Sequence, residues 1–366
     1  SVCNLMGDAY PELKEKSTHI ALVIGTEETL FNQTLDRGIT HLEKLISNLK
    51  SSKIILGNDA FKLYDTYGFP LDLTELIARE KNIEVDEEGF HLEMAKQKEK
   101  ARQAGNFKLK EKSIDWIELL KGKDSEFIGY DYLEAHSKVL KYSEVEDGCI
   151  LVLDKTPFYP ESGGQVGDRG KISFDGVDLN VIDVQNYNGM VIHLCKGVVL
   201  DWSKMVSVQC IVNEAYRSSV KRNHTATHLL HAALKSELGD QVQQAGSLVH
   251  PNYLRFDLTY FEKITSVQIK RIENIVNSQI LLNSALNTSV QAYDEAISSG
   301  VVALFGEKYG DHVRVVSTGK FSNELCGGTH VNNTGDIGLF KIIEESSLAS
   351  GVRRIVAVTG IAALDL

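Results

Sequence analysis

No apolar run in this 366-residue chain approaches the roughly 18 residues needed to span a bilayer. The first residues, SVCNLMGDAYPELKEK, also lack the basic segment followed by an apolar segment that marks a signal peptide. We therefore expect a cytoplasmic protein that contacts no membrane. Because the chain begins at Ser1, in a segment typical of a helical unit, we also expect it to be a fragment of a longer protein.

Cysteine is scarce, with five residues spread over the whole length. An odd number at such wide spacing argues against a disulfide framework and predicts reduced thiols, of which one or two at most have a chemical role. The five are Cys3, Cys149, Cys195, Cys210 and Cys326.

Basic residues are outnumbered, with 39 Lys and Arg against 50 Asp and Glu and a formal net charge of -11. This balance argues mildly against nucleic-acid binding, because phosphate contacts normally need Lys and Arg. Residues 96–123 depart from it, with nine Lys or Arg against four acids. That segment either faces phosphate or forms a solvated helix face followed by a basic loop, and charge alone does not separate the two.

The texture of the sequence predicts an α+β multidomain protein with two or three domains. Residues 1–105 read as a helix bundle, because apolar residues between Leu30 and Leu49 recur at steps of three and four. Residues 106–212 read as a basic linker followed by a small Gly-rich β-barrel or sandwich. Its strands are expected between Gly148 and Val212, in the runs ILVLD, KISF, LNVIDV, MVIHL and VSVQCIV.

Residues 213–366 mix both kinds of element and predict a two-layer α+β domain. One helix is expected over 213–238 and a second over 265–286. Between them, strands around Ser247 to Leu258 should form a hairpin that turns at Pro251 and Asn252.

A pair of histidines lies within the first of these helices, in the sequence HTATH. His224 and His228 are four residues apart, so both imidazoles face one side of the helix and can reach one ion. The spacing is also compatible with a buried pair that only makes hydrogen bonds. His231 follows on the same face, one turn too far to be the first choice of ligand.

A second pair, Cys326 and His330, lies in the Gly-rich sequence CGGTH. Glycine lets the backbone fold tightly enough for both side chains to point inward, and thiolate with imidazole suits Zn²⁺. The two pairs are too far apart for a zinc finger, so the fold must bring them together. We therefore predict one Zn²⁺ per chain.

Two other motifs are excluded on their central residues. A HExxH metallopeptidase needs glutamate after the first histidine, where this chain has Thr225. A P-loop needs Ser or Thr after its lysine, but Lys171 is followed by Ile172, and the glycine expected before Gly170 is Gln165.

Polar residues outside the two pairs give weaker signals. Gly163, Gly164 and Gln165 form a flexible turn with an amide that could approach a phosphate or an ester, although a β-turn between strands explains them equally well. Gln244 presents an amide beside a site, or only a polar strand end. Arg353 and Arg354 are adjacent near a strand start, so at least one should be exposed and available to RNA or to a surface salt bridge.

Four motifs, in order, resemble the editing domain of alanine-tRNA ligases and of their free-standing relatives: HTATHLLHAAL, QAGSLV with LRFDL, CGGTHVNNTGDIG and SGVRRIVAVTG. Upstream, YDTYGFPLDLTELI resembles the tRNA-recognition helices of the same ligases. FYPESGGQVGD resembles the Gly-rich barrel segment before the editing core. The resemblance covers nearly the whole chain.

The resemblance implies a set of site residues and a substrate. Zinc would be held by His224, His228, Cys326 and His330, and Gln244 would lie near the amino acid being tested. The reaction would be hydrolysis of seryl- or glycyl-tRNA specific for alanine. The alternative is a noncatalytic tRNA-binding module in which zinc only holds the fold.

The resemblance also implies what lies outside the sequence. The ATP- and alanine-binding domain would precede Ser1, and a dimerising, RNA-binding region would follow Leu366. We therefore expect a monomer that edits mischarged tRNA without charging tRNA itself.

Overall fold

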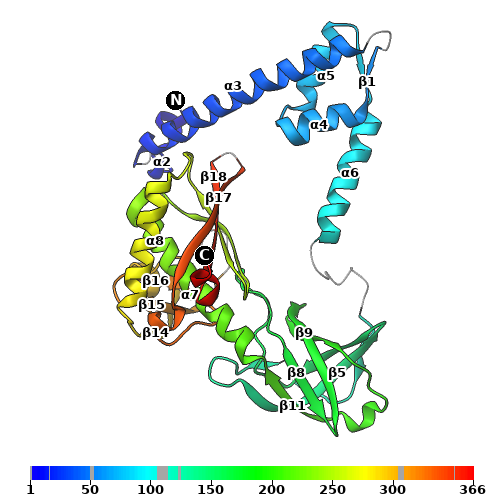
Figure 1. The fold of residues 1–366 in the computed structure, drawn as a ribbon, viewed down its shortest axis with the longest axis vertical. Helices are drawn as coiled ribbons and strands as arrows, with labels where there is room; N and C mark the ends of the chain where they lie inside the picture. The colour runs from blue at the N-terminus through cyan, green and yellow to red at the C-terminus, as the bar shows by residue number, and fades with distance from the viewer. Residues whose placement is uncertain are drawn as a thin grey trace. The chain divides into compact units, whose positions relative to one another are not determined.

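Two units make up the chain, residues 1–113 and residues 114–366. The computed structural model describes residues 2–15, 17–49, 53–104, 114–122, 125–303, 309–349 and 351–366 (Figure 1). Within those residues, no helix is both long and apolar enough to cross a membrane.

The first unit is helical, as predicted, around a core that includes Leu42, Leu63, Phe69 and Phe90. Its short parallel pair of strands, β1 with β2, was not predicted. Its elements are α1 (Val2–Met6), α2 (Glu12–Glu15), α3 (Ser17–Asn48), β1 (Ile54–Ile55), α4 (Gly57–Tyr67), α5 (Leu71–Glu80), β2 (Glu84–Val85) and α6 (Glu87–Ala104).

Six strands of the second unit close into a barrel in the order β11-β8-β9-β10-β6-β5, because β11 also pairs with β5. All five predicted runs are strands of this barrel, and strand β3 extends it beside β5. The barrel strands are β3 (Ile117–Glu118), β5 (Glu134–Val145), β6 (Gly148–Leu153), β8 (Gly170–Phe174), β9 (Val177–Tyr187), β10 (Met190–Lys196) and β11 (Ser207–Val212). A small parallel pair, β4 (Glu126–Phe127) with β7 (Lys155–Thr156), and the 3-10 turn η1 (Trp202–Lys204) complete this part.

The rest of the second unit is a helix layer on a four-stranded antiparallel sheet of order β12-β13-β18-β17. Helices α7 and α8 pack on this sheet through a shared apolar core that includes Leu230, Phe256, Val276 and Ile355. A three-stranded sheet, β14-β15-β16, lies beside this layer. The elements are α7 (Glu214–Leu238), β12 (Gln244–Val249), β13 (Leu254–Thr259), α8 (Ser266–Leu281), β14 (Leu286–Ala292), α9 (Tyr293–Ser298), β15 (His312–Thr318), β16 (Ser322–Leu325), η2 (Thr334–Ile337), β17 (Phe340–Ala349), β18 (Val352–Thr359) and α10 (Ile361–Leu364).

The helix boundaries follow their caps. Helix α7 begins after Asn213, whose side chain accepts a hydrogen bond from the Tyr216 N–H. Helix α8 begins after Thr265, which forms a capping box with Gln268. The predicted end of this helix at residue 286 is wrong, because α8 stops at Leu281 and Asn283 takes a left-handed φ of 49°.

A buried histidine gives the barrel a pH-dependent stability. His193 is fully buried, with Nε2 2.7 Å from Thr156 Oγ1 and Nδ1 3.2 Å from the Leu151 carbonyl oxygen. Burial lowers the pKa of His193 to about 4. Below about pH 6.5 this histidine is protonated in the unfolded chain but stays neutral in the folded barrel. The free energy of unfolding therefore falls as the pH drops from about 6.5 towards 4, by roughly 3 kcal/mol in all.

Unfolding of wild type and of His193→Gln, followed by the fluorescence of Trp116 and Trp202, tests this expectation. The stability advantage of wild type over the variant should shrink as the pH is lowered from 7 to 4, because only wild type carries the unprotonated histidine. Parallel stability curves over that range would contradict it.

Candidate metal centre

Helix α7 places His224 and His228 one turn apart, both of them buried. Buried apolar residues on the same helix, including Leu229 and Leu230, anchor it in the core, so these polar rings are held in place by packing. The two rings stack with their centroids 5.2 Å apart. Local helix geometry therefore produces half of the cluster.

The other half comes from the loop after β16, which carries Cys326 and His330. Gly328 is required here, because a Cβ at this position would lie 2.0 Å from a carbon of the His224 ring. The Arg314 guanidinium donates to the carbonyl oxygens of Cys326 and Gly328, both at 2.9 Å. Tyr130 adds a hydrogen bond of 2.6 Å to the Gly327 carbonyl and thereby fixes the loop from the barrel side.

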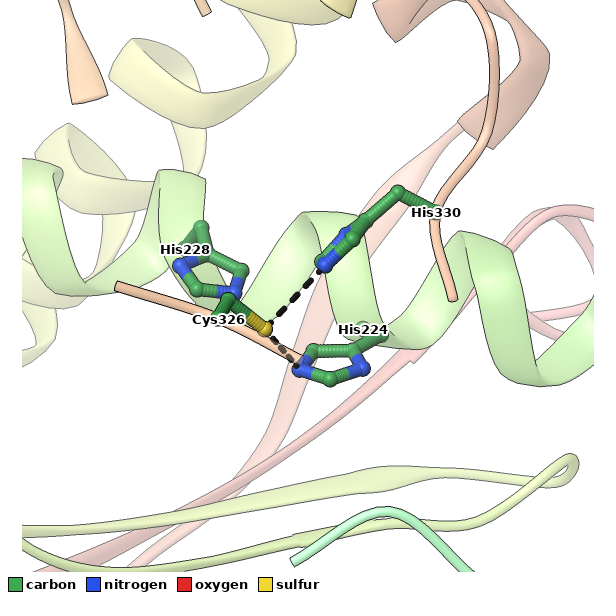
Figure 2. A group of neighbouring side chains, drawn as sticks. All are labelled: His224, His228, Cys326 and His330. Atoms are coloured by element: carbon green, nitrogen blue, oxygen red, sulfur yellow. Dashed lines mark hydrogen bonds between the residues drawn. The ribbon is translucent and has the colours of Figure 1, made fainter. Parts of the chain in front are cut away.

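The fold brings the two predicted pairs together. One ligand atom from each of His224, His228, Cys326 and His330 lies within 4.8 Å of the others. Figure 2 shows the four side chains converging, with the Cys326 sulfur 3.4 Å from His224 Nε2 and 3.3 Å from His330 Nε2. His231 is outside this group, as expected.

Hydrogen bonds on the outer side orient two of these histidines. The Thr225 hydroxyl donates to the Lys221 carbonyl, so the same oxygen can only accept from His330 Nδ1, 3.2 Å away. His228 Nδ1 contacts one oxygen of the Glu324 carboxylate. Since Nδ1 of each ring is engaged outward, Nε2 is left for the interior of the cluster.

Glu324 is a residue that the sequence analysis missed. Its second carboxylate oxygen lies 2.9 Å from His231 Nδ1, so this buried acid joins His231 to the candidate ligand His228. It stands only two residues before Cys326, inside a strand, and no spacing rule marked it. Its role here is to hold a neighbouring ring, as acidic partners of metal-binding histidines do.

The electrostatics of the cluster favour a cation. Burial alone would raise the pKa of Cys326, but His224, His330 and His228 hold it well below its usual value, which favours the thiolate form. Burial alone would likewise lower the pKa of His228, but Glu324 and Cys326 hold it well above its usual value. His228 thus lies between two anions, where a metal cation could replace its proton.

These residues satisfy the requirements of a metal site. Three imidazole nitrogens and one thiolate form a donor set typical of Zn²⁺. His228 Nε2 is buried and, within the described part of the chain, has no hydrogen-bond partner, as expected of a ligand atom.

A cavity of about 270 Å³ opens beside the cluster. Gln244, at the start of β12, lines it, together with Tyr159, Thr227 and Ser247. His224, His228 and Cys326 form part of the same wall. The structure thus places Gln244 and three of the four candidate ligands around one space of the size of a small amino acid.

The Gly-rich turn of Gly163, Gly164 and Gln165 lies next to the cavity, but its glycines and its glutamine differ in what they contact. Gly163 lines the cavity, and Gly164 packs so closely on β12 that a Cβ there would lie 2.5 Å from Ser247 Oγ. Gln165, which we expected to contact RNA, has no exposed surface, and its amide makes hydrogen bonds to His224 and Thr329. That expectation fails in this structure, because the Gln165 amide is buried and hydrogen-bonded inside the protein.

The two arginines on β18 are paired with acids. Arg353 donates to Glu345 at 2.6 Å, and Arg354 makes two hydrogen bonds to Asp257, at 2.7 and 2.8 Å. Their side chains are 13% and 26% exposed, so each offers RNA only part of its guanidinium. Much of the basic segment 96–123 lies outside the described residues.

Comparison with known proteins agrees with this architecture. Residues 1–216 match the family described as tRNA synthetases class II (A), and residues 313–356 match the threonyl and alanyl tRNA synthetase second additional domain. The second match runs from β15 into β18 and includes Cys326 and His330.

Curated relatives are similar over almost the whole chain. The alanine-tRNA ligase of Carboxydothermus hydrogenoformans is 46% identical over 385 residues, covering 100% of this chain and 43% of that protein. Those of Christiangramia forsetii and Shewanella amazonensis are each 47% identical over 98% of this chain, covering 41% and 42% of their own lengths. The chain thus spans about two fifths of the length of these relatives. It belongs to the class II (A) tRNA synthetases and, within them, to the alanine-tRNA ligase family.

Proposed function

We propose that the second unit hydrolyses the ester bond of wrongly charged tRNA specific for alanine. The observation that carries this proposal is a cavity of about 270 Å³ lined by Gln244 and by three members of the four-residue cluster, His224, His228 and Cys326. A site for a long peptide would need an extended groove, whereas this cavity suits one aminoacyl group at the end of a larger molecule.

The substrates proposed are seryl-tRNA and glycyl-tRNA specific for alanine. A pocket built for alanine admits the smaller glycine, and it rejects serine poorly because one added hydroxyl changes the shape little. A second site that hydrolyses the wrong products supplies the missing discrimination. Polar groups on the cavity wall, such as the Thr227 hydroxyl and the Gln244 amide, can distinguish a serine hydroxyl from an alanine methyl.

The metal proposed is one Zn²⁺ per chain, held by His224, His228, Cys326 and His330. When bound, zinc acts as a Lewis acid, or only as a structural brace if all four ligands close its shell. The histidines are held by their outer hydrogen bonds, and Gln244 faces the space that an ester would occupy.

The tRNA itself would be held by surface groups around the cavity. Gly163 lines the cavity and Gly164 follows it in the chain, so their backbone amides are candidates for RNA contact, as are the exposed parts of Arg353 and Arg354. We propose a cytoplasmic monomer, with dimerisation confined to the longer ligase. The relatives are named as alanine-tRNA ligases, but we do not propose that this chain charges tRNA with alanine.

Single-turnover deacylation tests the proposal. Excess protein should release serine from seryl-tRNA specific for alanine and spare alanyl-tRNA. Gln244→Ala should slow the release, whereas Gln243→Ala, an exposed neighbour outside the cavity wall, should leave it unchanged. Release no faster than the uncatalysed background, with metal bound and tRNA binding intact, would instead identify a noncatalytic tRNA-binding module.

A further inference from the structure

The barrel reaches the metal centre through the segment 162–166. The Val249 N–H of β12 donates to the Gly164 carbonyl at 2.7 Å, and the Val166 N–H donates back to the Val249 carbonyl at 3.1 Å. These bonds dock the segment on the edge of the sheet in the α+β layer. Between them, the side chain of Gln165 enters the buried space next to His224.

The orientation of the Gln165 amide is fixed by an obligatory donor. The Thr329 backbone N–H lies 2.9 Å from one terminal atom of this amide, so that atom must be the oxygen, Oε1. The other terminal atom, Nε2, donates to Thr329 Oγ1 at 3.0 Å. Thr329 thus makes hydrogen bonds to both terminal atoms of the Gln165 amide, and only one orientation of the amide satisfies them.

The fixed amide in turn fixes a tautomer of His224. Its Nδ1 lies 2.7 Å from Gln165 Oε1, which can only accept, so Nδ1 carries the ring proton. The lone pair of the neutral ring is then on Nε2, the atom that lies 3.4 Å from the Cys326 sulfur inside the cluster. Without such an acceptor, either nitrogen could hold the proton.

We propose that Gln165 is a positioning residue for the metal centre, which sets the tautomer and ring orientation of the ligand His224. The proposal rests on the metal site proposed above. It assigns to the GGQ turn of the barrel a role inside the protein, because Gly164 allows close docking on β12 and the glutamine supplies the acceptor. The metal site thus depends on a residue from the barrel.

Three variants test this role. Gln165→Met keeps the length of the side chain but removes the acceptor, whereas Gln165→Glu keeps an acceptor oxygen facing His224. Gln209→Met makes the same chemical change on β11, at a half-buried position outside the cavity wall. Zinc affinity is measured by competition with a chromophoric chelator. In Co²⁺-substituted protein, the shifted and exchangeable Nδ1–H resonance of His224 reports the hydrogen bond directly.

Gln165→Met should weaken zinc binding by about 10- to 100-fold and remove or shift the His224 resonance, while the other two variants stay within a few-fold of wild type. Wild-type affinity and resonance in Gln165→Met would overturn the proposal, as would equal losses in Gln165→Glu. A wild-type protein that takes up no metal would overturn it together with the metal site. Absence of deacylation alongside the expected metal results would refute only the proposed activity.

Discussion

Replacing Cys326 with Ser is expected to reduce bound zinc from one equivalent per chain to a small fraction of one. The thiolate is the only anion among the four candidate ligands, and three histidines hold its pKa well below the usual value despite its burial. The loss of affinity should exceed the roughly 10- to 100-fold cost of losing an outer partner. Metal content after dialysis, and thiolate ligation seen by X-ray absorption, measure it.

Cys3→Ser is the matched control, because it changes a half-exposed thiol in the first unit, outside the cluster. It should retain one zinc per chain. Full metal content in a Cys326→Ala, His330→Ala double variant would contradict the four-ligand assignment.

Deacylation should also fall to background in Cys326→Ser, and the melting curve decides how to interpret that loss. A variant that keeps the wild-type melting temperature but loses hydrolysis places the metal in the reaction or in substrate binding. Parallel loss of both places it in folding. A closed shell of four protein ligands favours the second result, and an open or exchangeable position favours the first.

The cluster of four candidate ligands could be anticipated from the sequence because each half of it is local. His224 and His228 share a helix face by their spacing alone, and Cys326 and His330 share one short loop. That the halves meet depended on the fold, and the family resemblance supplied this information in advance. His231, which was not the first choice of ligand, is informative too, because its position one turn further along made it a partner of Glu324.

The residues around the ligands could not be predicted, because their partners are distant in the chain. Gln165 meets His224 across 59 positions and Glu324 meets His228 across 96. A polar residue in a Gly-rich turn is normally exposed, so the sequence suggested that the Gln165 amide approaches a phosphate or an ester. Strand β5 was not predicted from the sequence, because its charged residues conceal an alternation between buried and exposed positions.

Replacing Arg217 with Met is expected to lower the free energy of unfolding of the second unit by about 3–5 kcal/mol. The side chain, on α7, is 1% exposed, and its guanidinium pairs with the equally buried Asp168 of the barrel part. It also donates to the carbonyl oxygens of Gly129 at 2.6 Å and Pro157 at 2.8 Å. Methionine fills similar space but leaves a buried carboxylate without its partner.

Denaturant unfolding followed by tryptophan fluorescence measures this loss. Arg271→Met is the control, because Arg271 is 64% exposed and its pairing with Glu237 should contribute no more than about 1 kcal/mol. Combining Arg217→Met with Asp168→Leu should recover part of the loss, since it removes the stranded charge as well. A change below about 1 kcal/mol in Arg217→Met would show that solvent reaches the pair.

The same variant should also affect the metal centre. Arg217 lies seven residues before His224, two helical turns earlier on the same side of α7, and Asp168 lies three residues after Gln165. The ion pair therefore holds the barrel against the helix beside the contact between Gln165 and His224. If this ion pair helps to keep Gln165 next to His224, Arg217→Met should lower the zinc affinity of protein that is still folded. The double variant should lower it less. Unchanged zinc affinity would show that the bonds to Val249 hold Gln165 without help from the ion pair.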